Sequence, residues 1–188
     1  MSFINLSDDD KNCLLQTAKK SIGYGLQHHH ALPVEIKKYN DLLQTHGASF
    51  VTLNLNKQLR GCIGTLEAHQ PLINDVSEHA YAAAFEDPRF PKVTEPEIEL
   101  LEISISILTS ATPVEFTSEK NLLGQLKPGV DGIILQSGFH KATFLPAVWE
   151  QISKAEDFIN HLKIKAGLDK HDWPDDLKIS RYQAINIK

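Results

Sequence analysis

The sequence predicts an α+β fold whose mainly antiparallel sheet is flanked by helices. Two observations indicate this class: a long run of strict apolar–polar alternation, and short strands paired at turns with amphipathic helical segments between them. The 188 residues are 41% hydrophobic and 23% charged, which allows an ordinary apolar core without a disulfide or a structural metal. We therefore expect one soluble domain over residues 1–188, either as a single unit or as two subdomains that share a core.

The N-terminal half of the sequence predicts two helices separated by a hairpin. Apolar residues at helical spacing predict a helix over 7–22, which should end at the glycines of 23–25 because glycine readily adopts the left-handed conformation. Apolar runs on either side of Asn56-Lys57 predict two short strands between residues 48 and 65. A stripe of apolar and small residues over 71–85 then predicts a helix that packs closely on a sheet.

The C-terminal half begins with the clearest strand, 101–108, in which isoleucines alternate with polar side chains. Turn residues and periodicity then predict two strands, two helices and a closing strand, at 130–135, 139–145, 146–152, 155–166 and 179–187. On the second of these helices, Lys163 and Lys165, near Trp173, are expected to form a solvated face rather than to contact an anionic partner.

Composition excludes several classes of protein. The chain has 24 acidic residues against 19 Lys and Arg, a formal net charge of −5, whereas a nucleic-acid-binding domain usually carries a basic excess. We therefore do not expect general binding of DNA or RNA. The sequence shows neither a signal-peptide pattern nor an apolar stretch of about 20 residues, so we expect no membrane span. Its two cysteines, Cys13 and Cys62, predict a reducing, cytoplasmic location rather than a disulfide framework.

The segment 59–65, Leu-Arg-Gly-Cys-Ile-Gly-Thr, is the strongest candidate for a functional site. Its glycines stand where a strand prefers bulky side chains, which indicates the close approach of another group. Residues two apart in a strand share a face, so Arg60 and Cys62 should project together, and a neighbouring guanidinium favours the nucleophilic thiolate. The alternative is that Cys62 is a small hydrophobe packed in a tight hairpin, as free cysteines often are.

Two further segments contain candidate ligand-binding residues. Asp87-Pro88-Arg89 ends the helix over 71–85, because proline disfavours helical geometry in the residue before it. This segment is either a structural turn or a stiff loop on which Arg89 holds an anionic ligand. Asp131-Gly132 is either a turn pair or a carboxylate beside a close backbone approach.

The sequence shows no established metal or nucleotide motif. His28 with His30 and Asp157 with His161 are the local pairs with spacing suited to a metal, and neither has an identifiable third ligand. Phosphate-binding loops, dinucleotide fingerprints and the hydrolase nucleophile elbow are absent from the sequence. We therefore expect no metal site, and the sequence does not identify a cofactor.

Five segments together resemble the AMMECR domain family in their order and approximate spacing: 59–65, Asp87–Phe90, Gly129–Leu135, Leu145-Pro146 and Lys165–Leu168. The similarity extends over nearly the whole chain. Bacterial and archaeal members of this family occur as protein A of the AmmeMemoRadiSam system. The resemblance implies an α+β fold of two unequal lobes around a shared core, with segment 59–65 near the lobe junction.

The resemblance also implies a cellular context. Relatives are encoded with, and sometimes fused to, Memo-like proteins, and they are found beside radical S-adenosylmethionine enzymes, which implies a shared modification pathway. In one hypothesis the protein is a thiol-dependent enzyme or group-transfer component, with Cys62 as the catalytic nucleophile and Arg60 activating it or holding an anionic group. The substrate-binding candidates are then Gly61, Gly64, Thr65, Arg89 and Asp131. In the alternative hypothesis the protein is a non-enzymatic binding or adaptor module, and Cys62 is structural.

Overall fold

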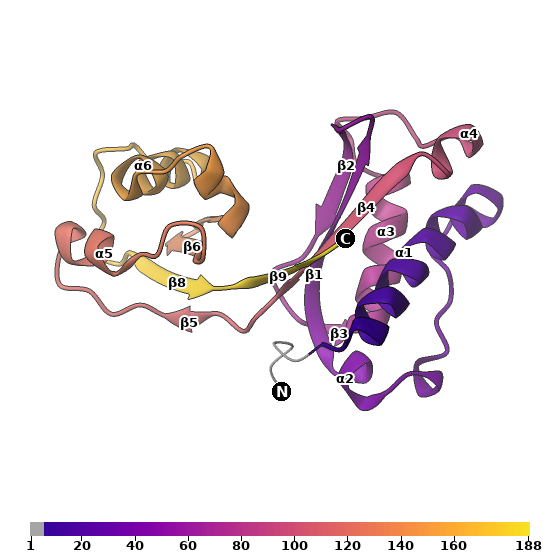
Figure 1. The fold of residues 1–188 in the computed structure, drawn as a ribbon. Coiled ribbons are helices and arrows are strands. Elements are labelled where there is room, and N and C mark those ends of the chain that lie inside the picture. Colours follow the sequence, from indigo (N-terminus) through magenta and orange to yellow (C-terminus); the bar gives the residue numbers. More distant parts are fainter. Residues whose placement is uncertain (1–5) are drawn as a thin grey trace. The chain divides into compact units, whose positions relative to one another are not determined.

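The computed structural model describes residues 6–188, and the chain divides into two compact units. Unit 1 comprises Met1–Leu108 and Ile185–Lys188, and unit 2 comprises Thr109–Ala184. Each unit buries its own cluster of apolar side chains. The structure therefore has the expected α+β class, with antiparallel pairing in both units (Figure 1). It has two clusters of buried apolar residues where the sequence suggested one shared core.

The sheet of unit 1 has the strand order β2-β1-β4-β9, with the short β3 paired to β1. Its strands are β1 (His46–Leu55), β2 (Gln58–Gly64), β3 (Gln70–Pro71), β4 (Leu101–Leu108) and β9 (Ala184–Ile187). The predicted hairpin is confirmed, because β1 and β2 pair antiparallel around Asn56 and Lys57. Both turn residues have positive φ, 52° and 65°, which is the backbone geometry of the tight turns that match strand twist.

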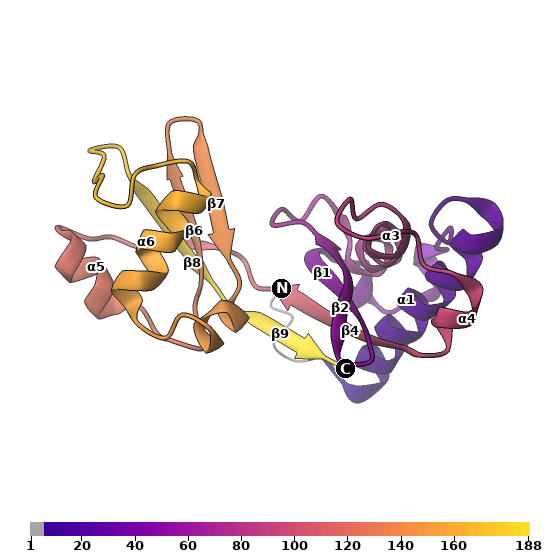
Figure 2. The ribbon, with the colours of Figure 1, turned by 90° about the horizontal axis from the view of Figure 1, so that it is seen from above.

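The helices of unit 1 cover one face of this sheet. They are α1 (Asp8–His28), α2 (Asp41–Gln44), α3 (Leu72–Phe85) and α4 (Glu95–Ile98), with a 3-10 turn, η2 (Ile36–Lys38). α3 packs on β1 and on α1, as Figure 2 shows. Val51 and Leu53 of β1 are fully buried against the helices, whereas Thr52 between them lies on the opposite, partly exposed face.

The first helix is longer than predicted. It begins at the expected place, where Ser7 and Asp10 form a capping box, but it continues through the glycines of 23–25 to His28. Gly25 does not end the helix because it serves packing, and a side chain there would collide with the ring of Tyr81 on α3. The left-handed residue that ends the helix is His29, with φ 60°, whose N–H donates to the Gly25 carbonyl.

Unit 2 contains a four-stranded sheet of order β5-β8-β6-β7. Its strands are β5 (Thr112–Pro113), β6 (Gly132–Ser137), β7 (His140–Phe144) and β8 (Lys178–Tyr182), and its helical segments are α5 (Glu119–Gln125), η3 (Pro146–Glu150) and α6 (Ala155–Lys165). The predicted β6–β7 hairpin and the helix α6 are present. The segment expected as a helix over 146–152 is a 3-10 helix, and its Trp149 stacks on Phe158 of α6 with ring centroids 3.8 Å apart.

One side chain of α6 contradicts the sequence analysis. Lys163 was expected on a solvated helix face, but it is 1% exposed. Its ammonium donates to Glu119 Oε1 at 3.1 Å and to the Lys170 carbonyl at 3.2 Å, and it lies 4.8 Å from the centre of the Trp173 ring. Burial is possible because these partners replace water around the charge while the four-carbon stem packs in the core.

The predicted closing strand, 179–187, is divided between the two sheets. β8 belongs to the sheet of unit 2 and β9 to that of unit 1, with Gln183 between them. Gln183 exchanges two hydrogen bonds with Thr109: the Thr109 N–H donates to the Gln183 carbonyl at 2.9 Å, and the Gln183 N–H donates to Thr109 Oγ1 at 2.8 Å.

Among the described residues, no helix has both the length and the apolar character to cross a membrane.

Candidate functional site

Segment 59–65 forms most of β2, which lies at the edge of the sheet in unit 1. The pairing with β1 shifts at Arg60: Gly61 lies opposite Leu53 and Leu59 lies opposite Asn54, so Arg60 is the extra residue of a β-bulge. A bulge interrupts the regular alternation of side chains. The expectation that Arg60 and Cys62 share a face assumed regular alternation, which does not hold at this bulge.

The Arg60 side chain anchors the segment that follows the Asp-Pro-Arg turn. Its Nε donates to Glu97 Oε1 at 2.8 Å and its Nη2 donates to Glu97 Oε2 at 3.2 Å. The guanidinium also donates to the carbonyls of Pro91 and Lys92, at 2.7 and 3.1 Å. The hydrogen bonds of Arg60 therefore go to residues 91–97, and the guanidinium is engaged in holding this segment.

The Glu97 carboxylate accepts hydrogen bonds from two residues, Arg60 and Thr94. Besides Arg60, the Thr94 backbone N–H and hydroxyl donate to its Oε2 at 2.7 and 2.8 Å, which forms a capping box at the start of α4. The hydrogen bond from Arg60 is the largest of the effects that lower the pKa of Glu97 to about 2. Glu97 was not among the sequence candidates, since a capping box gives no indication of a long-range arginine partner.

Cys62 is half-buried on the face of β2 that does not contact the helices, directly opposite Thr52 of β1. The Thr52 hydroxyl donates to Cys62 Sγ at 3.3 Å. The Cys62 N–H donates to Asp87 Oδ2 at 2.9 Å, and its carbonyl accepts from Arg89 Nη2 at 3.2 Å. The N–H and the carbonyl of Cys62 are therefore both held by hydrogen bonds, while its side chain stays partly accessible.

Asp87 and Arg89 form a closely matched pair in the turn after α3. Arg89 Nε donates to Asp87 Oδ1 at 2.9 Å and Nη2 donates to Oδ2 at 2.7 Å, while the Arg89 backbone N–H also donates to Oδ1. The Asp87 side chain is 2% exposed and that of Arg89 is 56% exposed. The Arg89 guanidinium holds the pKa of Asp87 well below its usual range. Arg89 is thus placed beside Cys62, with its charge compensated by Asp87.

The other motif residues make close backbone contacts. A side chain at Gly61 would collide with the Ala83 carbonyl oxygen of α3, and one at Gly64 would collide with the Ser49 carbonyl oxygen of β1. The Thr65 N–H donates to that Ser49 carbonyl at 3.0 Å. The close approach that the glycines indicated is therefore made by the protein's own backbone, and the substrate-binding role of these residues stays a prediction.

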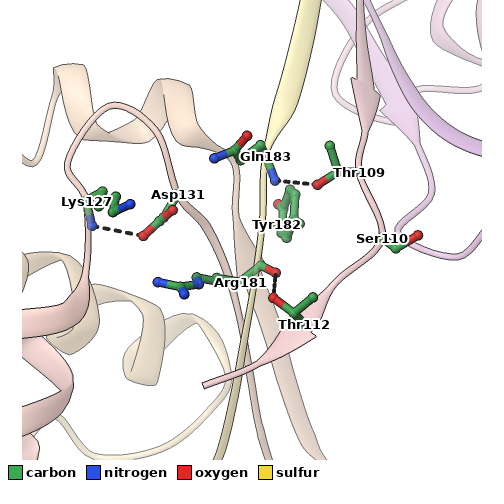
Figure 3. Close-up of a pocket in the computed structure, with 8 residues that line it drawn as sticks. All are labelled: Thr109, Ser110, Thr112, Lys127, Asp131, Arg181, Tyr182 and Gln183. Atoms are coloured by element: carbon green, nitrogen blue, oxygen red, sulfur yellow. Dashed lines mark hydrogen bonds between the residues drawn. The ribbon is translucent and has the colours of Figure 1, made fainter. Parts of the chain in front are cut away.

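Asp131 belongs to unit 2, whereas the other candidate residues belong to unit 1. It is 2% exposed, its Oδ2 accepts from the Lys127 N–H at 2.9 Å, and its carbonyl accepts from Trp149 Nε1 at 2.7 Å. Asp131 lines a polar pocket that also contains Lys127 and Arg181 (Figure 3). Sequence reasoning missed Arg181, because only the pairing of β8 with β6 brings it to this loop.

The candidate metal pairs have other partners. The His28 ring stacks on Tyr24, with centroids 4.0 Å apart, and His30 Nδ1 contacts the Ala31 carbonyl. His161 Nδ1 contacts the backbone carbonyl of Asp157 at 2.8 Å. Within residues 6–188, no three His, Cys, Asp or Glu side chains are grouped so that they could hold a metal ion.

These features define a two-unit α+β protein in which the buried Asp87, paired with the exposed Arg89, holds a cysteine on an edge strand. A family model described as AMMECR1 matches residues 15–187. A protein of Methanothermobacter thermautotrophicus is 33% identical over 98% of this chain and 96% of its own length. A protein of Methanocaldococcus jannaschii is 36% identical over 80% of this chain and 77% of its own. The chain belongs to the AMMECR1 family, which confirms the resemblance of its motifs.

A solved structure supports the same assignment. The crystal structure of the uncharacterized protein PH0010 from Pyrococcus horikoshii is similar to this chain, with a TM-score of 0.86 and 29% sequence identity. The similarity covers 96% of this chain and 92% of the Pyrococcus chain. The fold is therefore shared over almost the whole length of both proteins.

Proposed function

We propose that this protein is a thiol-dependent group-transfer component of a modification pathway, with Cys62 as the nucleophile. The observation that supports this best is the environment of Cys62. Both polar groups of its backbone are fixed by the ion pair of Asp87 and Arg89, and its sulfur accepts a hydrogen bond on a partly exposed face. Such positioning limits the motion of a nucleophile relative to a bound substrate.

The surroundings of the sulfur suit a developing negative charge. A hydroxyl that donates to the sulfur stabilises the thiolate form. Arg89 rather than Arg60 is the cation beside Cys62, because its Nη2 donates to the Cys62 carbonyl at 3.2 Å, whereas the hydrogen bonds of Arg60 go to residues 91–97.

The proposed step is a nucleophilic substitution at an electrophilic carbon of the substrate. The thiol proton passes to water, the sulfur forms a new bond to carbon, and the leaving group departs with the electron pair of the bond that breaks. A second acceptor then takes the group from the sulfur in the same manner. The family resemblance supports Memo-like and radical S-adenosylmethionine proteins as partners, and the two free cysteines favour the cytoplasm as location.

The test is the rate of alkylation of Cys62 by iodoacetamide as a function of pH, read by mass spectrometry on the full chain. Cys13 is the internal comparison, because burial raises the pKa of its thiol. We expect Cys62 to react about tenfold faster than Cys13 near pH 7, and we expect Thr52→Val to slow Cys62 alone. Alkylation of Cys62 only when the protein unfolds would refute the proposed nucleophile.

A second candidate function is a binding or adaptor module with a structural Cys62. It is favoured by the contacts of Arg60, Gly61 and Gly64, which are explained by packing and ion pairing without any substrate. The two functions differ in the expected effect of Cys62→Ser. A folded Cys62→Ser protein that still co-purifies with a co-encoded Memo-like protein and keeps the pathway's activity would favour the adaptor.

A further inference from the structure

A polar pocket in unit 2 has the composition of a ligand site that is separate from Cys62. The pocket has a volume of about 220 Å³ and is formed by the loop Lys127–Asp131 and the end of β8. The loop is fixed by its own hydrogen bonds, because the Val130 and Asp131 N–H groups both donate to the Lys127 carbonyl. The walls of the cavity are therefore built by ordered backbone.

Arg181 supplies an uncompensated positive charge to this pocket. Its backbone is held in the middle of the sheet, since it pairs with Ile133 of β6 and with Thr112 of β5. Figure 3 shows its side chain extending from β8 toward the loop that carries Lys127 and Asp131. Over the part of the chain that the structure describes, the half-buried Arg181 guanidinium makes no hydrogen bond or ion pair.

This lack of partners distinguishes Arg181 from Arg60 and Arg89. Those two guanidinium groups are paired with Glu97 and Asp87 in bidentate geometry. A half-buried guanidinium without a partner loses part of its hydration without compensation, and an oxyanion ligand would supply that compensation in the same bidentate manner. The Lys127 ammonium lines the same pocket and adds a second positive charge.

Asp131 places a carboxylate in the same pocket as the positively charged Arg181. One of its carboxylate oxygens accepts from the Lys127 N–H, which holds the side chain in place. Asp131 and Arg181 line one cavity, and among residues 6–188 the structure shows no ion pair between them. Two opposite charges held apart across a cavity can bind the two ends of one small molecule, an anionic group at Arg181 and a donor at Asp131.

We propose that this pocket binds a small oxyanion compound that also carries a hydroxyl group, such as a hydroxycarboxylate or a hydroxylated phosphate ester. Arg181 and Lys127 bind the carboxylate or phosphate, and Asp131 accepts a hydrogen bond from the hydroxyl. At about 220 Å³ the cavity is smaller than the ~300–1,000 Å³ of drug-sized sites. The ligand is therefore a compound of a few carbon atoms rather than a nucleotide or a peptide.

The test is a titration of the full-length protein, labelled with nitrogen-15, monitored by the NMR signals of backbone amides. The probes are two matched pairs: glycolate with acetate, and glycerol 3-phosphate with inorganic phosphate. Ionic strength is kept constant with sodium chloride. We expect saturable shifts at the amides of Lys127, Asp131 and Arg181, with the hydroxylated member of each pair binding several-fold more tightly. The pair that binds more tightly identifies the anionic group.

Variants distinguish a specific binding site from non-specific attraction of anions to positive charge. Arg181→Gln should weaken binding at least about tenfold, and Asp131→Asn should remove the preference for glycolate over acetate. Lys178→Gln is the control, because it removes an exposed positive charge from the same strand without changing the pocket. Arg181→Lys keeps the charge but loses the bidentate geometry, so it should bind with intermediate affinity.

The outcome is independent of the thiol hypothesis. Cys62→Ser should bind glycolate as the wild-type protein does, because Cys62 belongs to unit 1. Equal shifts in the wild-type, Arg181→Gln and Lys178→Gln proteins would overturn the pocket proposal, as would shifts that sodium chloride alone reproduces. Neither result would affect the reactivity expected of Cys62.

Discussion

The Asp87 carboxylate accepts a hydrogen bond from the Cys62 backbone N–H at 2.9 Å, and this contact links the turn after α3 to the exposed edge of the sheet. An edge strand leaves N–H and C=O groups without a neighbouring strand. At Cys62 both groups are satisfied by one ion pair, since Arg89 donates to the Cys62 carbonyl while it binds Asp87. The Asp87–Arg89 pair thus replaces the missing neighbouring strand at the position of the candidate nucleophile.

Replacement of this carboxylate tests its structural role. We expect Asp87→Asn to lower the free energy of unfolding of unit 1 by about 2 kcal/mol, because the amide lacks the negative charge and presents donor hydrogens to a guanidinium that solvent partly screens. Urea unfolding followed by hydrogen exchange of unit 1 amides measures this change. Glu35→Gln is the control, because the Glu35–Lys38 pair is exposed and should contribute less than about 1 kcal/mol. Equal effects of the two substitutions would contradict this account.

The glycine before Cys62 provides a second prediction. In Gly61→Ala the new methyl group would collide with the Ala83 carbonyl oxygen, which belongs to the backbone of α3 and cannot rotate away. We expect a loss of stability of about 2–3 kcal/mol or more, by the same measurement. Gly23→Ala is the matched control, since Gly23 lies in α1 with open space around it. That substitution should stabilise the protein by about 0.5–1 kcal/mol through better helix propensity.

The local patterns of the sequence predicted most elements of the fold. β4 has the predicted bounds, and the hairpin of β1 and β2 and the helices α3 and α6 lie where periodicity placed them. The division into two cores could not be read in this way. No glycine or proline interrupts residues 179–187, and only long-range pairing shows that β8 and β9 belong to different sheets.

The candidate site shows the same limit. The motif around Cys62 and the Asp-Pro-Arg turn were recognisable as local segments, but their contact was not. The bulge at Arg60 depends on a mismatch between two strands, so strand periodicity could not reveal that Arg60 binds Glu97. Arg181 belongs to no motif, and it reaches the pocket only through the register of β8 with β6.

The buried Lys163 provides a third prediction, in unit 2. Lys163→Ala should destabilise this unit by about 2–3 kcal/mol, because it removes the packed stem together with the ammonium. Lys163→Met keeps most of the stem, and it leaves a Glu119 side chain that is 42% exposed and can be hydrated. We therefore expect Met to cost less than half as much as Ala. Tryptophan fluorescence reports this unit, since Trp149 and Trp173 both lie in it. Equal losses with Met and Ala, which both remove the ammonium, would show that the charge, not the packing, stabilises this position.

The pair of Arg60 and Glu97 predicts a defined dependence of stability on pH. In the folded protein the pKa of Glu97 is lowered to about 2, from an ordinary value of 4.5. A carboxyl group whose pKa is lower in the folded than in the unfolded state stabilises the fold above its unfolded pKa, and this contribution is lost as the pH falls through the folded pKa. Glu97→Gln should therefore cost about 3 kcal/mol near pH 6, a difference from the wild-type protein that shrinks steadily between about pH 4.5 and pH 2.

The measurement is the difference in unfolding free energy between wild-type and Glu97→Gln proteins at a series of pH values. Other acidic groups, Asp87 included, titrate in both proteins, so their effects cancel in this difference. A second pair of proteins, Arg60→Gln with and without Glu97→Gln, should show a much smaller pH dependence, because Arg60 is the largest of the effects that lower this pKa and only the Thr94 hydrogen bonds remain. If the difference within this second pair kept the full pH dependence, the Thr94 hydrogen bonds rather than Arg60 would account for the low pKa of Glu97. Arg60 would then not anchor residues 91–97 through this carboxylate.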